Sequence, residues 1–255
     1  MHRRGPAAAA VTIALAALAL SPTYDAGRAA LAATSILPDL TMVPPFDFSI
    51  DVSSGRKLLR FSTVVANVGK GPFYLTGYDS DGAVIGDTLF VRQHIAQSNG
   101  TAKVRETTAR MEYGTDGHNH WHVLGYQQFK LQNLDVETVG TGAKTGFCSL
   151  DSYWYGSKRA SWFNADRSIC QVNATGIVLM GTSRKWGDIY RSDLAFQWVD
   201  ITGLPNGRYK LKVIVDPPWP TGGQFLESNE ANNRAWVRIR ISGNTVTVLS
   251  SSPKP

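Results

Sequence analysis

Histidine and cysteine are scarce in this chain of 255 residues, which has five histidines and two cysteines. The chain also lacks an internal repeat, a helical periodicity longer than about a dozen residues, and a Lys/Arg cluster of the kind that follows phosphates. No segment after residue 33 is apolar enough to cross a bilayer. These absences argue against a helical bundle, a repeat protein and an integral membrane protein, and we expect no nucleic-acid partner.

The N-terminus has the composition of a secretory signal. Arg3 and Arg4 precede an apolar run from Ala7 to Leu20, which is short for a membrane span. We therefore predict a signal peptide at 1–33, a mature domain at 34–255, a secreted, extracellular protein, and no stable membrane insertion after cleavage. An uncleaved membrane anchor is the alternative. Cleavage would remove three arginines and one aspartate, so the formal charge would fall from +6 to a mildly basic +4.

Both cysteines, Cys148 and Cys170, lie in the mature chain. An even pair in an exported protein predicts a disulfide, which would close a loop of about 20 residues and stabilise the fold by ~3 kcal/mol in the chain-entropy model. A free thiol or a metal thiolate is the alternative.

Strand patterns dominate the rest of the sequence. Two segments, 207–215 and 237–241, alternate apolar and basic residues, which is typical of a strand with one buried and one exposed face. Turn residues separate the other predicted strands, which are 57–68, 73–78, 88–95 and 121–131. We therefore predict an all-β fold, a single-domain antiparallel β-sandwich, with a long irregular section from about 132 to 190 around the active site.

Three of the five histidines, His118, His120 and His122, occupy alternate positions. In a strand such residues share one face, so the triplet predicts an extended backbone. Three imidazoles on one face can bind zinc, copper, nickel or iron and leave coordination positions open, although solvent-facing strand histidines are the alternative. The outer two Cα atoms would be roughly 13 Å apart in an ideal strand, so we expect a bend or strong twist, which Gly117 and Gly125 can permit.

Four motifs follow one another along the chain. They are Leu37-Pro38-Asp39-Leu40, the histidine triplet with Tyr126-Gln127-Gln128-Phe129, Lys144-Thr145-Gly146-Phe147-Cys148, and Asp188-Ile189-Tyr190 with Gln197-Trp198-Val199-Asp200-Ile201-Thr202. Together they resemble the catalytic domain of the lysyl oxidase family and span nearly all of the mature chain. The single cysteine pair, and Thr115 where animal members have a further histidine, depart from the animal pattern and suggest a smaller, bacterial secreted member.

The resemblance implies copper at His118, His120 and His122, and an organic cofactor, lysine tyrosylquinone, formed by a cross-link between Lys144 and Tyr190. The implied enzyme is a copper amine oxidase of the lysyl oxidase type, a protein-lysine 6-oxidase. It would use molecular oxygen to oxidise primary amines to aldehydes, with release of ammonia and hydrogen peroxide. The expected substrates are peptidyl lysine, small alkyl amines or diamines. The candidates for the general base are Asp116, Asp188 and Asp193.

A calcium site is implied near the C-terminus. Family members with a Glu-Ser-Asp-x-x-Asn-Asn run there are expected to bind calcium together with the Asp-Leu of the opening motif. The matching residues of this chain are Asp39, Leu40, Glu227, Asn229, Asn232 and Asn233. Oxygen ligands suit this hard cation. Asn229 stands where an acid is usual, which lowers the ligand charge, and an Asn-rich turn without a metal is the alternative.

Two other classes of function stay open. A non-catalytic exported copper- or zinc-binding protein would use the histidine triplet but would not need Lys144 and Tyr190 as a pair. A wall-associated adhesion module would account for a β-sandwich and a basic charge but not for the triplet.

Overall fold

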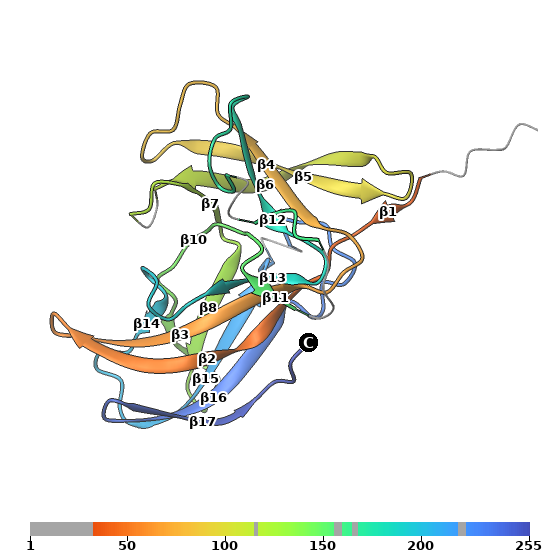
Figure 1. Ribbon diagram of the computed structural model, residues 1–255. Helices are drawn as coiled ribbons and strands as arrows, with labels where there is room; N and C mark the ends of the chain where they lie inside the picture. Colours follow the sequence, from red (N-terminus) through yellow and green to blue (C-terminus); the bar gives the residue numbers. More distant parts are fainter. Residues whose placement is uncertain (1–32, 115–116, 156–159, 165–167, 219–222) are drawn as a thin grey trace, which may run out of the picture. The chain divides into compact units, whose positions relative to one another are not determined.

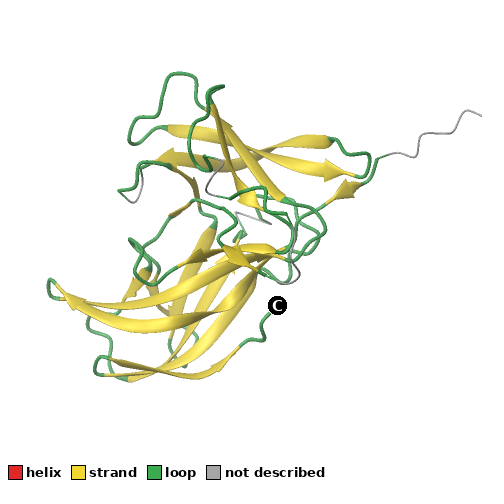
Figure 2. Ribbon diagram, viewed as in Figure 1, coloured by secondary structure: helices red, strands yellow, loops and turns green. Residues whose placement is uncertain are grey.

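Strands are the only regular elements in the part of the chain that the computed structural model describes, which is residues 33–114, 117–155, 160–164, 168–218 and 223–255. The strands form three antiparallel sheets (Figures 1 and 2). The predicted all-β fold is therefore confirmed. Among these residues there is no helix that could cross a membrane. The predicted signal peptide, apart from Ala33, and the candidate base Asp116 lie outside the described residues.

The first sheet has seven strands in the order β10-β7-β6-β5-β4-β12, with β1 paired to β5. These strands are β1 (Ser35–Ile36), β4 (Phe73–Tyr78), β5 (Thr88–Gln97), β6 (Ala102–Tyr113), β7 (Trp121–Leu124), β10 (Gly146–Phe147) and β12 (Ile177–Thr182). The predicted single strand at 121–131 is wrong. Gly125, with a φ of 67°, and the buried Tyr126 separate β7 from the next strand, which joins a different sheet.

The second sheet has the order β11-β13-β3-β14, with β2 on the free edge of β3. Its strands are β2 (Leu40–Ser53), β3 (Arg56–Asn67), β11 (Tyr153–Trp154), β13 (Trp186–Tyr190) and β14 (Trp198–Asp200). Pro44 and Pro45 lie inside β2, where the register with β3 shifts between Val43 and Phe46. Proline has no N–H to donate, so a sheet tolerates it at an edge or a bulge, and β2 provides both.

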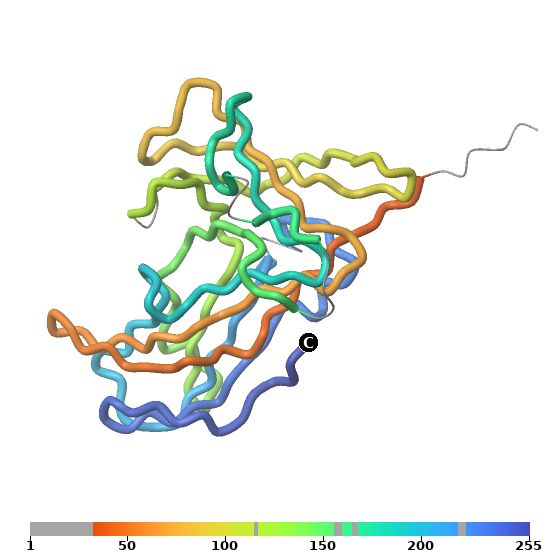
Figure 3. The backbone as a smooth tube through the Cα atoms, in the orientation of Figure 1, coloured from red at the N-terminus to blue at the C-terminus, as the bar shows by residue number. Residues whose placement is uncertain are grey.

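The third sheet has the order β17-β16-β15-β8-β9. Its strands are β8 (Gln127–Gln132), β9 (Thr138–Thr141), β15 (Gly207–Val215), β16 (Arg234–Ser242) and β17 (Thr245–Ser251). The predicted alternation in β15 is confirmed, since Tyr209, Leu211, Val213 and Val215 are buried. Strand β2 packs against β15, β16 and β17, so segments from opposite ends of the domain lie side by side (Figure 3).

A chain of aromatic rings joins the three sheets and leads to the candidate site. Phe61 of β3 packs edge-on against Phe129 of β8, with ring centroids 5.2 Å apart. Phe129 meets Phe147 of β10 at 6.1 Å, and Phe147 meets Tyr190 of β13 at 5.0 Å. The section predicted to be irregular, 132–190, contains β9 to β13, and the short strands β10 and β13 present Phe147 and Tyr190 to each other.

Candidate metal centre and cofactor site

The three histidines of the triplet come together in the structure. The candidate ligand nitrogens of His118, His120 and His122 lie within 4.8 Å of one another. The ring centroids of His120 and His122 are 4.3 Å apart, and those of His118 and His120 are 5.3 Å apart. A bond from a metal to imidazole is about 2.0–2.1 Å long, so two nitrogens on one metal are separated by at most about 4 Å. Small side-chain rotations reach that distance, and the cluster can hold a transition metal.

A turn, rather than a continuous strand, gathers these side chains. His122 lies in β7, but His118 and His120 precede it, so the prediction of one extended segment through all three is wrong. The His120 N–H donates to the His118 carbonyl at 3.0 Å, and the Gly114 N–H donates to the His120 carbonyl at 3.1 Å. Gly117 has a φ of 80°, which glycine adopts without strain, and the bend expected there is present.

Burial changes across the triplet. His122 is buried, His120 is half-buried and His118 is exposed. The cluster is therefore anchored in the protein at one end and accessible from solvent at the other. This arrangement suits a site that must admit a small reactant, because a purely structural metal site is usually closed by protein ligands.

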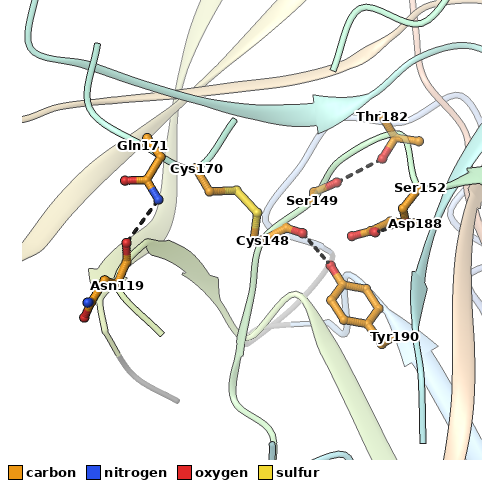
Figure 4. Close-up of a disulfide and its surroundings, with 9 residues drawn as sticks. All are labelled: Asn119, Cys148, Ser149, Ser152, Cys170, Gln171, Thr182, Asp188 and Tyr190. Atoms are coloured by element: carbon orange, nitrogen blue, oxygen red, sulfur yellow. Dashed lines mark hydrogen bonds between the residues drawn. A yellow bond between two sulfur atoms is a disulfide. The ribbon is translucent and has the colours of Figure 1, made fainter. Parts of the chain in front are cut away.

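The disulfide links the histidine turn to the segment that follows Lys144. Cys148 and Cys170 are bonded, as predicted (Figure 4). The Cys170 carbonyl accepts a hydrogen bond from the Trp121 N–H at 2.8 Å, and the Gln171 side chain donates to the Asn119 carbonyl at 3.0 Å. These contacts fix the backbone on either side of His120.

Lys144 and Tyr190 approach the same aromatic ring. Both side chains are buried, and only 6% of Lys144 and 5% of Tyr190 is exposed. The Lys144 Nζ lies 5.5 Å from the centroid of the Phe147 ring, and the Tyr190 ring packs against Phe147 at a 5.0 Å centroid distance. The Tyr190 hydroxyl donates to the Cys148 carbonyl at 3.0 Å (Figure 4). Phe147 is also the register partner of Val123, the residue after His122.

The lysyl oxidase family model matches residues 79–251, which is more than half of the chain. This chain belongs to the lysyl oxidase family. It is similar to lysyl oxidase homolog 2 of Bos taurus (31% identity over 151 residues) and of Homo sapiens (30% over 151 residues), in each case over 58% of this chain. The protein of the same name from Gallus gallus is 28% identical over 156 residues, or 60% of this chain. The chain spans 18% of the length of each of these relatives.

Family membership gives the site a chemical context. The lysyl oxidase family is known for copper and lysine tyrosylquinone, so membership implies an oxidoreductase and suggests amine oxidation. The structure supports one part of this context, because it contains a histidine cluster whose side chains can bind a metal. The bacterial origin stays a prediction.

Asp188, one of the candidate bases, is buried. Burial raises the pKa of its carboxyl group to about 7, although the hydrogen bond from Ser152 favours the charged form. The Ser152 hydroxyl donates to Oδ1 at 2.5 Å, while Oδ2 is buried and has no hydrogen-bond partner among the described residues. Asp193, a second candidate base, is exposed. The two candidates therefore differ in their surroundings, since Asp188 is buried and Asp193 is in contact with solvent.

The Asp-Leu motif and the 227–233 segment lie together, as the implied calcium site requires. The Glu227 carboxylate accepts hydrogen bonds from the Leu40 N–H and, at 3.0 Å, from the Asn233 side chain. The Asn232 side chain donates to Asp39 at 2.8 Å. The Oδ1 atoms of Asn232 and Asn233 are buried without hydrogen-bond partners among the described residues. Rotating each amide would exchange its oxygen and nitrogen and turn oxygens toward the carboxylates, as a shared cation requires.

Two acids outside the family motif join this cluster. Carboxylate oxygens of Asp216, Glu227 and Glu230 lie within 4.8 Å of one another. Burial and repulsion from the neighbouring acids raise the pKa of Glu227 to about 9 and that of Asp216 to about 6. Asn229 instead accepts a hydrogen bond from the Ala231 N–H at 3.1 Å within its own turn. The motif missed Glu230 because it occupies a variable position, and it missed Asp216 because that residue lies before the motif begins.

Proposed function

We propose that this protein is a copper- and quinone-dependent amine oxidase of the lysyl oxidase type. It would convert a primary amine, oxygen and water into an aldehyde, ammonia and hydrogen peroxide. The observation that carries the proposal is that Lys144 and Tyr190 are both buried and both contact Phe147, in the strand paired with β7. A buried lysine is rare without a partner or a function, and a lysine and a tyrosine on one ring are what a cross-linked cofactor needs.

The residues present fit the two groups. His118, His120 and His122 would hold copper, since their nitrogens converge and imidazole is a common copper ligand. Lys144 and Tyr190 would form lysine tyrosylquinone. When bound, copper would supply oxygen chemistry and the quinone would accept electrons from the amine. The chain would contribute the burial that keeps water from the cofactor, and the Cys148 carbonyl would orient the Tyr190 hydroxyl before the cross-link forms.

Asp188 would act as the general base. It is two residues from Tyr190 in the sequence, and the Tyr190 side chain is among the groups that favour its charged form. A base works best when its pKa is near the working pH, and burial has moved this carboxyl group there. The exposed Asp193 has no comparable environment.

The substrate class follows from the chemistry of the cofactor. A quinone reacts with an unhindered primary amine, and a lysine side chain or a diamine presents such an amine at the end of a flexible chain. We therefore propose peptidyl lysine, small alkyl amines or diamines as substrates, with the exposed His118 end of the triplet as the side of approach. The disulfide supports an exported, extracellular protein, because disulfides persist in oxidising compartments.

A calcium ion would occupy the second cluster. Its ligands would come from Asp39, Leu40, Glu227, Asn232 and Asn233, and Asp216 and Glu230 would supply the negative charge that Asn229 lacks. A divalent cation would relieve the repulsion among three neighbouring carboxylates, which is the reason the site suits a hard ion.

Tyr190→Phe tests the proposed function. Protein made with copper and oxygen should show a visible quinone absorbance, a mass that fits the cross-link, and amine-dependent peroxide release. Tyr190→Phe should keep copper but lose the absorbance and the peroxide, because the phenol is the cofactor precursor. Tyr209→Phe is the matched control, since this buried tyrosine donates to Pro205 in another part of the fold and its loss should leave both signals intact. Peroxide release that survives in Tyr190→Phe would refute the assigned cofactor.

The alternative is a non-catalytic copper- or zinc-binding protein. It is favoured only by the histidine cluster, which needs neither Lys144 nor Tyr190. In that case copper-loaded protein would have no quinone absorbance, and Tyr190→Phe would be indistinguishable from the parent in every measurement above.

A further inference from the structure

Arg234 of β16, opposite Ile214 of β15, is one of the cations on the outer face of the third sheet. Six others lie there in three directly opposed pairs. They are Lys130 of β8, Arg208, Lys210 and Lys212 of β15, and Arg238 and Arg240 of β16; we call this set the basic face. Each alternates with buried apolar residues that point to the core, so all six project to the opposite side. Arg208, Arg238 and Arg240 are exposed, and the three lysines are half-buried.

The strand register places these charges directly opposite one another. Arg208 pairs with Arg240, Lys210 with Arg238, and Lys212 with Lys130. Like charges at directly opposed positions destabilise a sheet. This repulsion affects Lys210, because burial and then the charges of Lys212 and Arg238 lower the pKa of its amino group.

No acid on these strands offsets the charge. None of the five strands of the third sheet contains an Asp or a Glu. The ion pairs found among the described residues involve none of the six cations. The sequence has no Lys/Arg cluster of the kind that follows phosphates, yet the folded chain gathers these cations on one face. The cations form no run in the sequence, because three strands contribute them and only the register brings them together.

We propose that the basic face binds a linear acidic polysaccharide. Regular rows of cations, spaced by the strand separation of about 5 Å in one direction and by about 7 Å along each strand, complement a polymer that carries one anionic group per sugar. Arginine at three of the six positions can bind carboxylate or sulfate through two parallel hydrogen bonds. The disulfide indicates an oxidising compartment, where acidic polysaccharides are abundant polyanions.

The details of the face favour a polysaccharide over a nucleic acid. The Trp236 ring lies on this face and has Lys210 Nζ 4.5 Å and the Arg238 guanidinium carbon 5.5 Å from its centroid, so these cations compete with a base for its surface. Proteins that bind single strands rely on open rings for stacking, and those that read a duplex insert a helix or ribbon into a groove. A sheet face with a half-buried ring provides neither.

The same face lacks the features of a membrane anchor. Interfacial binding to lipid usually combines cations with large apolar side chains that enter the bilayer. Strands β8, β15 and β16 expose no such side chain; Val248 and Leu249, which are exposed, belong to the edge strand β17. Electrostatic attraction to a soluble polymer needs only the charges.

Two variants with the same change in net charge test the proposal. The face variant combines Lys210→Gln, Arg238→Gln and Arg240→Gln. The control combines Lys70→Gln, Lys103→Gln and Arg110→Gln, which lie outside the third sheet. Binding of fluorescent polygalacturonate is measured on the full chain from about 50 to about 200 mM salt, because salt increasingly screens exposed charges over this range. Melting curves check that both variants fold; removal of like-charge repulsion should leave the face variant at least as stable as the parent.

The expected result is a selective loss in the face variant. Its affinity at 50 mM salt should fall at least about tenfold, and the slope of log affinity against log salt should decrease by about three, one for each lost contact. The control should keep the parent's affinity and slope. Equal losses in the two variants, or no binding by the parent at 50 mM salt, would overturn the proposal. Tighter binding of duplex DNA or of phosphatidylserine vesicles at equal charge concentration would overturn the choice of partner.

Discussion

At the scale of single residues, the proposed cofactor site is built from buried side chains that carry polar groups. Asp188, Lys144 and Tyr190 all lie in the interior, although all three carry ionisable groups that water would solvate better. The Phe147 ring packs against Tyr190 and lies 5.5 Å from the Lys144 Nζ, so an apolar ring borders both side chains. Such an environment weakens the fold and is retained where chemistry needs it.

Replacing Asp188 with Asn should slow amine oxidation without removing copper. Loss of a general base typically lowers kcat by about 10²–10⁴-fold. In the parent, the rate should fall as pH drops below about 7, because the raised pKa protonates Asp188 there, and this acid limb should be missing in the variant. Rates are normalised to quinone absorbance, so that incomplete cofactor formation is not mistaken for slow catalysis. Asp193→Asn is the control and should match the parent; an acid limb that persists in Asp188→Asn would assign the base elsewhere.

The same carboxyl group should leave a signature in stability. Its folded pKa of about 7 exceeds the ordinary value of 3.8, so the stability it contributes is complete below about pH 4 and is lost as pH rises through about 7. Asp188→Asn should therefore gain stability relative to the parent as pH rises from about 4 to about 7, and the difference should stay constant above that. Thermal melts of the two proteins across this range measure the difference, and parallel curves would contradict a buried, titrating Asp188.

His120 should be essential for metal binding. His120 is the middle residue of the triplet, and its ring centroid lies 4.3 Å from that of His122. His120→Ala therefore removes the central ligand. We expect loss of stoichiometric copper and, as a consequence, loss of the quinone. His94→Ala provides the control, because His94 bonds to Thr76 and stacks on Tyr74 and should not affect copper. Full copper occupancy in His120→Ala, measured by elemental analysis, would disprove the ligand assignment.

At the scale of elements, the sequence predicted strands wherever apolar and polar residues alternate. Segment 207–215 matches β15, because its alternation reports directly which face is buried, and segment 73–78, predicted from the turn residues around it, matches β4. Strand β2 escaped because Pro44 and Pro45 interrupt it at a bulge, and β13 because both its faces are largely buried. Local patterns contain little information about such strands, whose pairing depends on neighbours distant in the sequence.

The candidate site was predictable for a different reason. The triplet and the Lys144 and Tyr190 pair were recognised through residue type and order, which do not require a correct backbone. The strand expected through His118 and His120 is a turn, yet the ligands converge. Asp216 and Glu230 could not be found in this way, since their role arises only when β15 and the 227–233 segment are brought together. The basic face could not be predicted for the same reason, because only the pairing of its strands brings the cations together.

The disulfide should matter more for the cofactor than for copper. Cys148 follows Phe147 directly, so the bond holds the strand that contacts both cofactor precursors. Replacing both cysteines with serine should lower the free energy of unfolding by about 3 kcal/mol in the chain-entropy model. Loosening of the segment that begins near Lys144 should reduce the quinone yield more than the copper content. The quinone yield is measured by absorbance and the copper content by elemental analysis, both on one preparation. A larger loss of copper than of quinone would contradict the prediction.

At the scale of the whole molecule, the ends of the domain are held together by polar contacts as well as by the core. Asp39 precedes β2 and Leu40 begins it, and the segment 227–233 leads into β16, so the acidic cluster joins the first long strand to one of the last. Three carboxylates at this junction repel one another, and the pKa of Glu227 is raised to about 9. Without a cation the junction is a weak point of the fold.

Calcium should therefore raise the melting temperature of the intact protein. A ligand that binds only the folded state stabilises it by about 2.7 kcal/mol at 100 times its Kd, which corresponds to roughly 5–10 °C for a domain of this size. Glu227→Gln should lose this response, because Glu227 contacts both Leu40 and Asn233. Glu137→Gln is the control, since Glu137 is exposed and bonds to Asn133 in a distant turn, and it should respond like the parent. The proteins are first freed of calcium with a chelator and the metal content is checked. If the parent then melts at the same temperature with calcium as with chelator, the junction binds no calcium, and the contacts around Glu227 stabilise it only as hydrogen bonds.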